Sequence, residues 1–595
     1  MVARDCNGMP LGPASSAQRS PAGSHSGGEA TTRTLRLGVL TGSGSIPDWL
    51  KEVTDAAALE GKAEVALIMD TGPVDVQGTS SPGKFVAPRR ASDLYLALED
   101  LLFAPKPDPQ ALHSLDELLP GVATVQIPSG PGAEVDPQAL ETIRSLALDV
   151  ILDSGQSPVP ASALGLARHG LWSCHVRTAT PSHEGTTAPD TPDASAPPNW
   201  GEGIAEVARE SPDTKVILWR VMGDPPEPFE IATSRFATDP VSARRNQTRY
   251  LYDASALMTQ ALHRLSAFGD PRPARSLGRS DPVARAPQPS PATGTSFGAT
   301  VCRSARLALR SVARKSRAAT TRDQWQLVVL PGNGGPAFRP RSGLRRLVPP
   351  RDRFWADPHI LRHQDRAYIF FEEYPYRTGR GHISVVEMDP DGRISPPRMV
   401  LQRGYHLSYP FVFRHGDDIY MVPETSENET VELYRATDFP DAWTLERILL
   451  HGVRGVDATL EFRDDRWWMF MGMRTNPHAK TSDTLHLYHT HDLLSGAWTP
   501  HPWNPILSDA QGARPAGRLF TVDGVLYRPG QQGIPTYGSG VILHEVTRLS
   551  PDEYEEHPVE TIAPGWEPDI IGTHTLSVGP ALTVLDAKVR RRRLP

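Results

Sequence analysis

Trp355-Ala356-Asp357-Pro358-His359-Ile360-Leu361 leads through a polar turn to Ala367-Tyr368-Ile369-Phe370-Phe371-Glu372-Glu373, and this hairpin pattern recurs along the second half of the chain. Comparable pairs of apolar runs occupy residues 407–424, 456–470 and 513–528, and a degenerate copy occupies 571–586. The copies are spaced about 50 residues apart, which is the length of one four-stranded propeller blade. The sequence therefore predicts an all-β five-bladed propeller over residues 322–589.

The starts of the repeats carry polar and charged side chains. In a propeller the innermost strands surround one axis, so residues at their starts converge although they are far apart in sequence. Carboxylates accept hydrogen bonds from sugar hydroxyls, and two carboxyl groups can act as acid and base in glycoside cleavage. We therefore expect a carbohydrate site in the axial funnel and no metal site. The candidate catalytic residues are Asp357, Glu424 and Asp457, and the candidate substrate-binding residues are Tyr409, His406, Glu372, Arg514, Arg518, Gln531, Tyr537 and His574.

The same residues also have an architectural interpretation, which stays open at this point. Propellers use repeat-start carboxylates to tie neighbouring blades together, and Asp357 fits that role. Arg514 with Arg518 has the same two interpretations, His574 fits a hydrogen-bonded structural residue, and Glu372 fits a solvated surface carboxylate.

Several of these motifs occur together, and in the same order, in a known family. Residues 351–588 resemble the propeller domain at the N-terminus of glucosamine inositolphosphorylceramide transferases. That domain in turn is similar to glycoside hydrolases of the arabinanase, xylosidase and invertase type, which use an Asp, an Asp and a Glu from the first three blades. Asp357 matches the first position, Tyr409 stands at the second, and Glu424 or Asp457 would have to supply the acid. The matching segments are Phe354-Trp355-Ala356-Asp357-Pro358, residues 406–413, Met421-Val422-Pro423-Glu424, Trp498-Thr499-Pro500-His501-Pro502, Arg514-Pro515-Ala516-Gly517-Arg518, residues 526–531, Tyr537-Gly538 and Gly572-Thr573-His574-Thr575.

The first half of the chain has an α/β pattern. Short apolar runs alternate with segments of helical periodicity, which is typical of right-handed βαβ units and a parallel, Rossmann-like sheet. We expect this domain to span residues 34–265. The predicted strands are 35–40, 63–69, 123–127, 149–152 and 170–175, and the predicted helices are 47–59 and 250–265.

Within this domain, residues 149–155 and 163–175 resemble the formyltransferase family, which includes methionyl-tRNA formyltransferase and the sugar N-formyltransferases. The resemblance implies His175 as a catalytic residue and 10-formyltetrahydrofolate as the cofactor, but only if the domain is active. Ser173 stands where the family has Asn, and residues 216–224 lack the family's Asp-x-Gly pattern. Because Ser cannot offer the same amide donor, we expect the domain to be inactive in formyl transfer, and no other cofactor is predicted.

The remaining segments are predicted to connect or flank these domains. Residues 1–33 are predicted to be disordered, 266–321 to be a Pro- and Arg-rich linker, and 590–595 to be a basic tail. The linker contains a basic helix at 299–317, which could contact an anionic membrane surface or dock on the protein itself.

Composition restricts the class of protein. The net charge of -7 gives no general attraction to nucleic acid, and no apolar run is long enough to span a membrane. The three cysteines form no CxxC pair, so a disulfide framework or zinc site is not expected, and a cytoplasmic location fits best.

Together these patterns predict a carbohydrate-active or carbohydrate-recognising protein of glycoconjugate synthesis or modification, with a glycan or glycoconjugate as its partner. Whether it is an enzyme stays open. The alternatives are a formyl-type transferase that acts on an amino sugar through His175, and a non-enzymatic scaffold that binds a glycan or protein.

Overall fold

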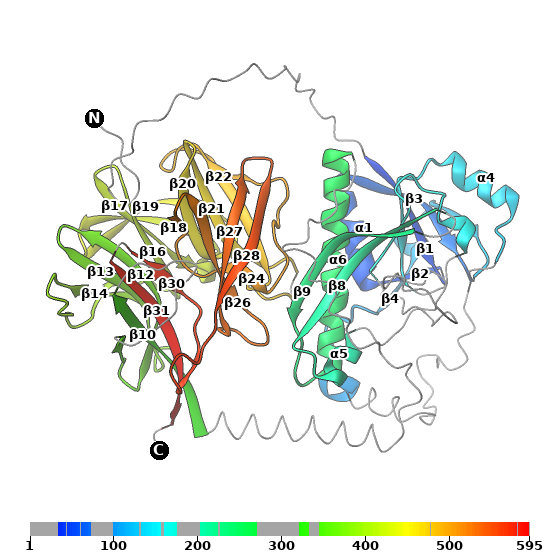
Figure 1. Ribbon diagram of the computed structural model, residues 1–595. Coiled ribbons are helices and arrows are strands. Elements are labelled where there is room, and N and C mark those ends of the chain that lie inside the picture. The colour runs from blue at the N-terminus through cyan, green and yellow to red at the C-terminus, as the bar shows by residue number, and fades with distance from the viewer. Residues whose placement is uncertain are drawn as a thin grey trace.

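The computed structural model describes residues 34–269 and 320–593, apart from 43, 60, 73–98, 130–132, 156–159, 175–202, 224–226, 332–343, 477 and 580. These residues form an α/β domain and a β-propeller (Figure 1). The segment 1–33, the predicted helix 299–317 and His175 lie outside the described residues.

The α/β domain is built on a seven-stranded sheet with the order β5-β3-β1-β6-β7-β8-β9. The first five strands run parallel, and the last two continue the sheet antiparallel. The chain extends one edge of the sheet and then returns to extend the other, which is the order of a doubly wound sheet. The strands are β1 (Leu35–Thr41), β3 (Ala63–Asp70), β5 (Ala123–Gln126), β6 (Val150–Asp153), β7 (Leu171–Ser173), β8 (Asp213–Met222) and β9 (Glu227–Ala237).

The five predicted strands are present, whereas the β8–β9 hairpin was not predicted. The helices α1 (Asp48–Leu59) and α6 (Ala243–Phe268) contribute to one core with the sheet. The Ser242 side chain caps α6 by accepting a hydrogen bond from the Arg245 N–H at 3.2 Å, and Gly269 ends the helix with φ 80°. The helix is therefore longer than predicted, and the linker does not begin at residue 266. Shorter elements are β2 (Ser45–Pro47), β4 (Leu112–Ser114), α3 (Leu115–Leu118), α4 (Pro137–Ser145), α5 (Ile204–Arg209) and a 3₁₀ turn at Ala161–Ala163.

The propeller consists of five sheets, and four of them are formed by strands that are consecutive in the chain. The inner hairpins of the first three blades coincide with the predicted repeats. Blade 1 is β12 (Arg353–His363), β13 (Arg366–Pro375), β14 (His382–Met388) and β15 (Arg398–Leu401), and blade 2 is β16 (Ser408–His415), β17 (Asp418–Thr425), β18 (Thr430–Asp438) and β19 (Ala442–His451). Blade 3 is β20 (Val456–Arg463), β21 (Arg466–Met473), β22 (Thr484–Thr490) and β23 (Thr499–Pro500), and blade 4 is β24 (Gln511–Pro515), β26 (Val525–Gln532), β27 (Gly540–Leu549) and β28 (Tyr554–Ile562), with β25 (Phe520–Val522) beside β26.

Blade 5 closes the ring by combining the two ends of the propeller sequence. Its order is β11 (Arg345–Leu347), β10 (Thr321–Pro331), β31 (Leu582–Arg592) and β29 (Ile570–Gly572), with β30 (Leu576–Val578) also paired to β31. β10 and β31 pair from Thr321–Arg592 to Pro331–Leu582. The prediction of a basic tail from residue 590 was therefore wrong for residues 590–592, because β10 supplies a pairing partner that continues the strand.

The two domains meet along α6 and β9 of the first domain and the loops of blades 3 and 4. The backbone of Arg235 exchanges hydrogen bonds with Ser508 and Ala510, at 3.0 and 2.8 Å. Tyr252 stacks on His478 with ring centroids 4.3 Å apart, and the Phe268 ring stacks in the same way on Trp503. Among the helices that the structure describes, none is both long enough and apolar enough to cross a membrane.

Candidate functional site

Three blades begin their inner strand with a β-bulge that contains a left-handed residue. These residues are Asp357, Tyr409 and Asp457, with φ of 53°, 43° and 54°, and the strand register shifts at each of them. A positive φ is uncommon for any residue but glycine and costs conformational energy, most of all for a bulky side chain such as tyrosine. Bulges re-aim a side chain relative to the strand. The repeated local distortion therefore sets these three side chains at equivalent places around the propeller axis.

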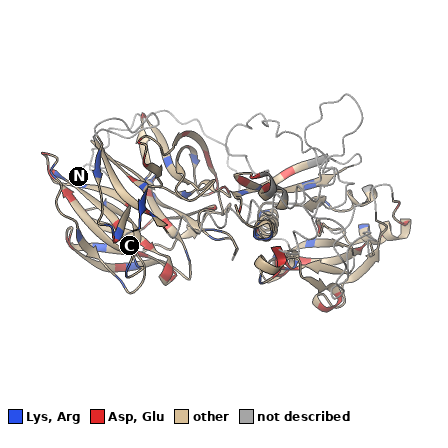
Figure 2. Ribbon diagram, turned by 90° about the horizontal axis from the view of Figure 1, so that it is seen from below, with Lys and Arg blue, Asp and Glu red and all other residues tan. Residues whose placement is uncertain are grey.

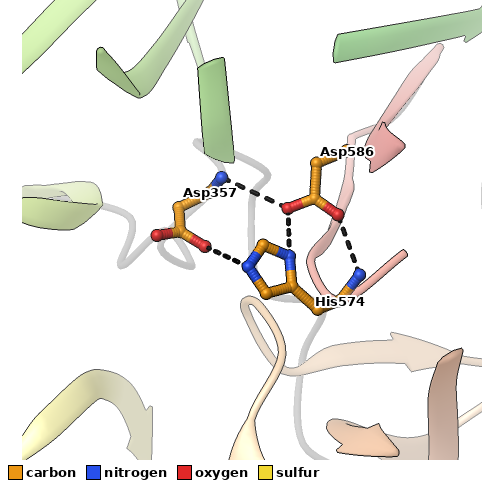
Figure 3. Close-up of side chains that lie close together, drawn as sticks. All are labelled: Asp357, His574 and Asp586. Atoms are coloured by element: carbon orange, nitrogen blue, oxygen red, sulfur yellow. Dashed lines mark hydrogen bonds and ion pairs between the residues drawn. The ribbon is translucent and has the colours of Figure 1, made fainter. Parts of the chain in front are cut away.

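Asp357, His574 and Asp586 form a buried network at the centre (Figure 3). The His574 ring bonds through Nδ1 to Asp586 and lies with Nε2 3.6 Å from an oxygen of Asp357. Asp586 also accepts hydrogen bonds from the N–H groups of His574, Thr575 and Asp357 at 2.8, 3.1 and 3.3 Å. The Thr575 hydroxyl donates to Asp357 at 2.9 Å. The network fixes the imidazole orientation and joins blade 5 to blade 1.

Aromatic rings surround His574. The Trp325 ring of β10 stacks on the imidazole, with centroids 4.1 Å apart, and the Tyr537 ring meets it edge-on at 5.0 Å. Trp325 is buried, whereas Tyr537 is 43% exposed as a residue. Sequence reasoning missed Trp325 because β10 precedes the first recognisable repeat.

Arg514 holds the carboxylate of Asp457. The Arg514 Nε and Nη2 donate to the two Asp457 oxygens, at 2.5 and 3.1 Å, and Gln531 donates to the same carboxylate at 2.8 Å. The Arg514 Nη2 also lies 3.6 Å from Glu424. Gly472 occupies the blade 3 position that corresponds to Glu424 of blade 2, and an added Cβ there would lie 3.7 Å from the Arg514 side chain. Asp457 is thus held by Arg514 and Gln531, and its role as the acid, for which Glu424 is the alternative, stays a prediction.

Glu372 and Glu424 occupy equivalent positions in blades 1 and 2, opposite the residue that precedes the bulge in each blade. Glu372 is buried, contrary to the interpretation as a solvated residue, and lies 3.4 Å from Nε2 of His406. The Gly381 N–H donates to Nδ1 of His406 at 2.9 Å, which leaves Nε2 as the protonated nitrogen facing Glu372. His406 and Glu424 are only partly buried and line the open side of the cluster.

Burial sets the protonation of this cluster. It raises the pKa of Asp357 to about 6 against the opposing charge of His574, and it raises the pKa of Asp457 to about 6 although Arg514 opposes it. Burial, together with the charges of Asp357 and Glu424, raises the pKa of Glu372 well above its usual range. For His574, burial acts to lower the pKa, but Asp586 and Asp357 raise it overall. The pKa of the Glu372 carboxyl group and that of the His574 imidazole are therefore both raised within one cluster.

Replacing Asp357 by asparagine should change how stability depends on pH. The folded pKa is raised above the ordinary value of 3.8, so the folded protein holds more protons than the unfolded chain between pH 4 and 6 and loses stability as the pH rises. Asp357→Asn removes this titration. As the pH rises from 4 to 7.5, the free energy of unfolding of the variant should increase relative to that of the parent by up to about 3 kcal/mol. Urea unfolding followed by tryptophan fluorescence measures the difference.

The control is Asp464→Asn, because Asp464 is also an aspartate in the left-handed conformation, at φ 52°, but lies in an exposed turn. If the free energies of unfolding of Asp357→Asn and Asp464→Asn depend on pH in the same way, the pKa of Asp357 is not raised in the folded protein.

Two predicted binding residues lie deeper in the propeller and do not line the funnel. The Tyr409 hydroxyl accepts a hydrogen bond from the Gly517 N–H at 2.7 Å and bonds to Thr459 at 2.8 Å. Arg518 bonds to the Val412 carbonyl and covers the Phe411 ring, with the guanidinium carbon 4.4 Å from its centre. Tyr409 is fully buried, and both residues connect neighbouring blades, so a binding role for them stays a prediction.

The oxygen and nitrogen atoms of Asp357, His574 and Asp586 lie within 4.8 Å of one another, so this trio has the donor types of a cation site. Its donors are already engaged with one another and with Thr575, as an orienting network requires. Asp586 was not among the predicted site residues, and the one signal for it in the sequence was its position at the end of the fifth repeat, after an apolar run.

Comparison with known proteins matches the propeller to one family. Residues 348–564 match the model of the N-terminal domain of glucosamine inositolphosphorylceramide transferase 1. The chain is 39% identical over 209 residues to the protein of that name from Oryza sativa subsp. japonica, and 36% identical over 206 residues to that from Arabidopsis thaliana. These matches cover 35% and 34% of this chain but only 28% and 27% of the relatives, so the chain spans little more than a quarter of their length.

Solved structures that resemble the chain include an exo-β-1,3-galactanase from Clostridium thermocellum, with 15% identity over 35% of this chain and 51% of the enzyme, and a TM-score of 0.29. A family 117 glycoside hydrolase from Zobellia galactanivorans shows 11% identity, covers 44% of this chain and 90% of the enzyme, and has a TM-score of 0.30. The strand pairing described above, and not these likenesses, establishes the propeller. The match over residues 348–564 thus relates blades 1 to 4, with Asp357, Glu424 and Asp457, to the N-terminal domain of glucosamine inositolphosphorylceramide transferase 1, whereas His574 and Asp586 of blade 5 lie outside it.

Proposed function

We propose that the propeller recognises a sugar unit of a glycoconjugate in its axial funnel. The observation that carries this proposal is the pair of left-handed bulges that hold Asp357 and Asp457 beside Glu372, Glu424 and Arg514. Backbone strain of this kind persists where surrounding structure over-determines it, and it concentrates at ligand sites. The names of the relatives, which are transferases of glucosamine to inositolphosphorylceramide, favour glycolipid synthesis as the setting.

The funnel offers the group types that a sugar requires. Glu372 and Glu424 supply carboxyl oxygens for hydroxyl groups, and Arg514 supplies N–H donors held in place by Asp457. The ring of the partly exposed residue Tyr537 provides an apolar face for the C–H side of a pyranose. Arg514 also lies under this ring, with its guanidinium carbon 5.4 Å from the centre, which fixes the two groups relative to each other.

Recognition of a sugar is better supported than its hydrolysis, in which two carboxyl groups would cleave the glycosidic bond. That chemistry needs one carboxyl group as the acid and a second, unpaired one as base or nucleophile. Asp457 is paired with Arg514, and Asp357 accepts a hydrogen bond from Thr575. Glu372 keeps its proton through burial and is therefore the group that would donate one to a bound substrate.

The test uses Asp357→Asn, which is the variant expected to gain stability at neutral pH. The full-length protein and the variant are incubated with a panel of glycans, glycolipids and nucleotide sugars, and retained ligands and new masses are scored by mass spectrometry. Asp357 adjoins Glu372 in the cluster, so removing its charge should weaken binding of the retained sugar by about 10- to 100-fold. Because the variant stays folded, weaker binding is not explained by misfolding.

Asp464→Asn again serves as the matched control and should retain the same ligand as the parent. A new product that disappears with Asp357→Asn would establish turnover in the funnel. Equal retention of the ligand by the parent protein and by Asp357→Asn would refute a sugar site at this place.

A further inference from the structure

An arginine-lined pocket lies between blades 5 and 1, apart from the acidic cluster. Its volume is about 250 Å³. It is formed at the free end of the β10–β31 ribbon, near the C-terminal end of the chain in Figure 1, and Figure 2 shows basic residues on the ribbons there. The lining residues are Arg322, Gln324, Arg351, Tyr376, Arg591, Arg592 and Arg593.

The arginines of this pocket form no ion pair with a carboxylate of the described residues, and Asp569 acts on Arg591 from a longer distance. Arg322 and Arg591 are direct partners in the register of β10 and β31, so their side chains leave the same face of the ribbon. Like charges that face each other directly destabilise a strand pair. Among the residues the structure describes, none of the five arginines forms an ion pair with a carboxylate. The nearby carboxylates are engaged elsewhere: Asp323 binds Arg590, Asp352 binds Arg353, and Asp569 binds Arg346.

Neighbouring groups hold the pocket in shape. The Arg322 guanidinium carbon lies 4.0 Å from the centre of the Tyr376 ring, which orients the guanidinium without removing its charge. The Tyr376 hydroxyl is buried and has no hydrogen-bond partner in the described part of the chain. Gln324 is 3% exposed, and its amide donates to the carbonyls of Pro350 and Arg353 at 2.9 and 2.8 Å, which fixes the segment that carries Arg351.

A cationic pocket with an unpartnered hydroxyl requires an anion that accepts several hydrogen bonds. Arginines match the geometry of phosphate, and a phosphate has enough oxygen atoms to bind two or three of them at once. We infer that this pocket binds a phosphate group of a phosphomonoester or phosphodiester, with Arg322 and Arg591 as its two central ligands. The pocket lies at the same end of the inner strands as the funnel, since Arg353 begins β12 four residues before Asp357.

The inference is tested with the full-length protein and two variants. Arg322→Gln/Arg591→Gln removes the facing pair. Arg590→Gln is the matched control, because Arg590 neighbours Arg591 in β31 but points to the other face and binds Asp323. Calorimetry measures the affinity for inorganic phosphate, and co-sedimentation measures binding to phosphatidylcholine vesicles with and without phosphatidic acid.

Loss of two charged donors should weaken phosphate binding at least about tenfold, whereas Arg590→Gln should leave it nearly unchanged. Phosphate should raise the melting temperature of the parent protein but not that of the double variant. The melting transition of the double variant shows that it is folded, and the missing shift shows that it has lost the site. Binding to inorganic phosphate without binding to phosphatidic acid vesicles would support a soluble phosphate ester, and binding to both would support a lipid headgroup. If the parent protein does not bind phosphate, or if both variants lose it equally, the inference is wrong. Neither outcome depends on the sugar site.

Discussion

Glu556→Leu should lower the free energy of unfolding by about 3–5 kcal/mol, because it leaves the buried Arg528 guanidinium without its partner. Glu556 and Arg528 are both fully buried and are joined by two hydrogen bonds of 2.6 Å across the central strand of blade 4. Although burial acts to raise the pKa of Glu556, Arg528 lowers it to about 2, so the pair is ionised at neutral pH. Chemical unfolding monitored by circular dichroism measures the loss.

A second variant separates the loss of the pair from the loss of packing. Arg528→Met/Glu556→Leu removes both charges and should recover most of the stability, since a buried ion pair is often replaceable by apolar residues of similar volume. Recovery should be incomplete because the Gly512 carbonyl and the Tyr554 hydroxyl each lose a partner. The exposed pair Arg548–Glu553 in the same blade is the control, and Glu553→Gln should have no measurable effect. A double variant as unstable as Glu556→Leu would contradict this account.

This pair also connects the core of blade 4 to the site. Arg528 donates to the carbonyl of Gly512 at 2.8 Å, and Gly512 has φ 115°, with the His544 ring 2.4 Å from where a Cβ would lie. Only glycine fits this position. The irregular segment that follows carries Arg514 towards Asp457. The stability of blade 4 and the position of Arg514 beside Asp457 are therefore coupled.

The sequence predicted the propeller because each blade repeats the same hairpin, with apolar residues on both faces of the inner strands and a polar turn. It placed Asp357, Asp457, Arg514 and His574 near one another for the same reason: equivalent positions of a closed ring converge. Blade 5 was incompletely predicted because half of it comes from β10 and β11, which lie far from β31 in sequence. No local pattern reports such a pairing, so Trp325 was missed.

The roles of individual side chains were harder to predict than their positions. Whether Tyr409 faces the ligand or the neighbouring blade depends on the Gly517 N–H and on Thr459, which are contributed by other blades. The pairing of Asp457 with Arg514 depends in the same way on blade 4, which contributes both Arg514 and Gln531. The family match at residues 348–564 does not include the α/β domain. The resemblance of that domain to the formyltransferases therefore stays a prediction.

Arg249→Met should weaken the contact between the two domains, because Arg249 forms a buried ion pair across it. It lies on α6 against Asp253 of the same helix and forms an ion pair with Asp483 of the propeller, and all three side chains are less than 10% exposed. The Phe236 ring packs on the guanidinium, with its centre 4.3 Å from the guanidinium carbon. Burial already raises the pKa of Asp253. Without Arg249, two carboxyl groups would remain buried together, and we expect a loss of about 3–5 kcal/mol in interdomain stability.

Hydrogen exchange of α6 and of residues 476–483 reports this loss directly, because both segments should exchange faster while the inner strands of the propeller keep their protection. Arg245→Met is the matched control: Arg245 lies one turn earlier on α6 and is about half exposed, with Asp239 as its partner within the α/β domain. That variant should leave exchange across the interface unchanged. Asn476 and Ser234 still donate to Asp253 at 3.1 Å in either variant, so they cannot account for a difference between the two. Equal protection in Arg249→Met and Arg245→Met would mean that stacking of Tyr252 on His478 and of Phe268 on Trp503 holds the domains together without the buried charge.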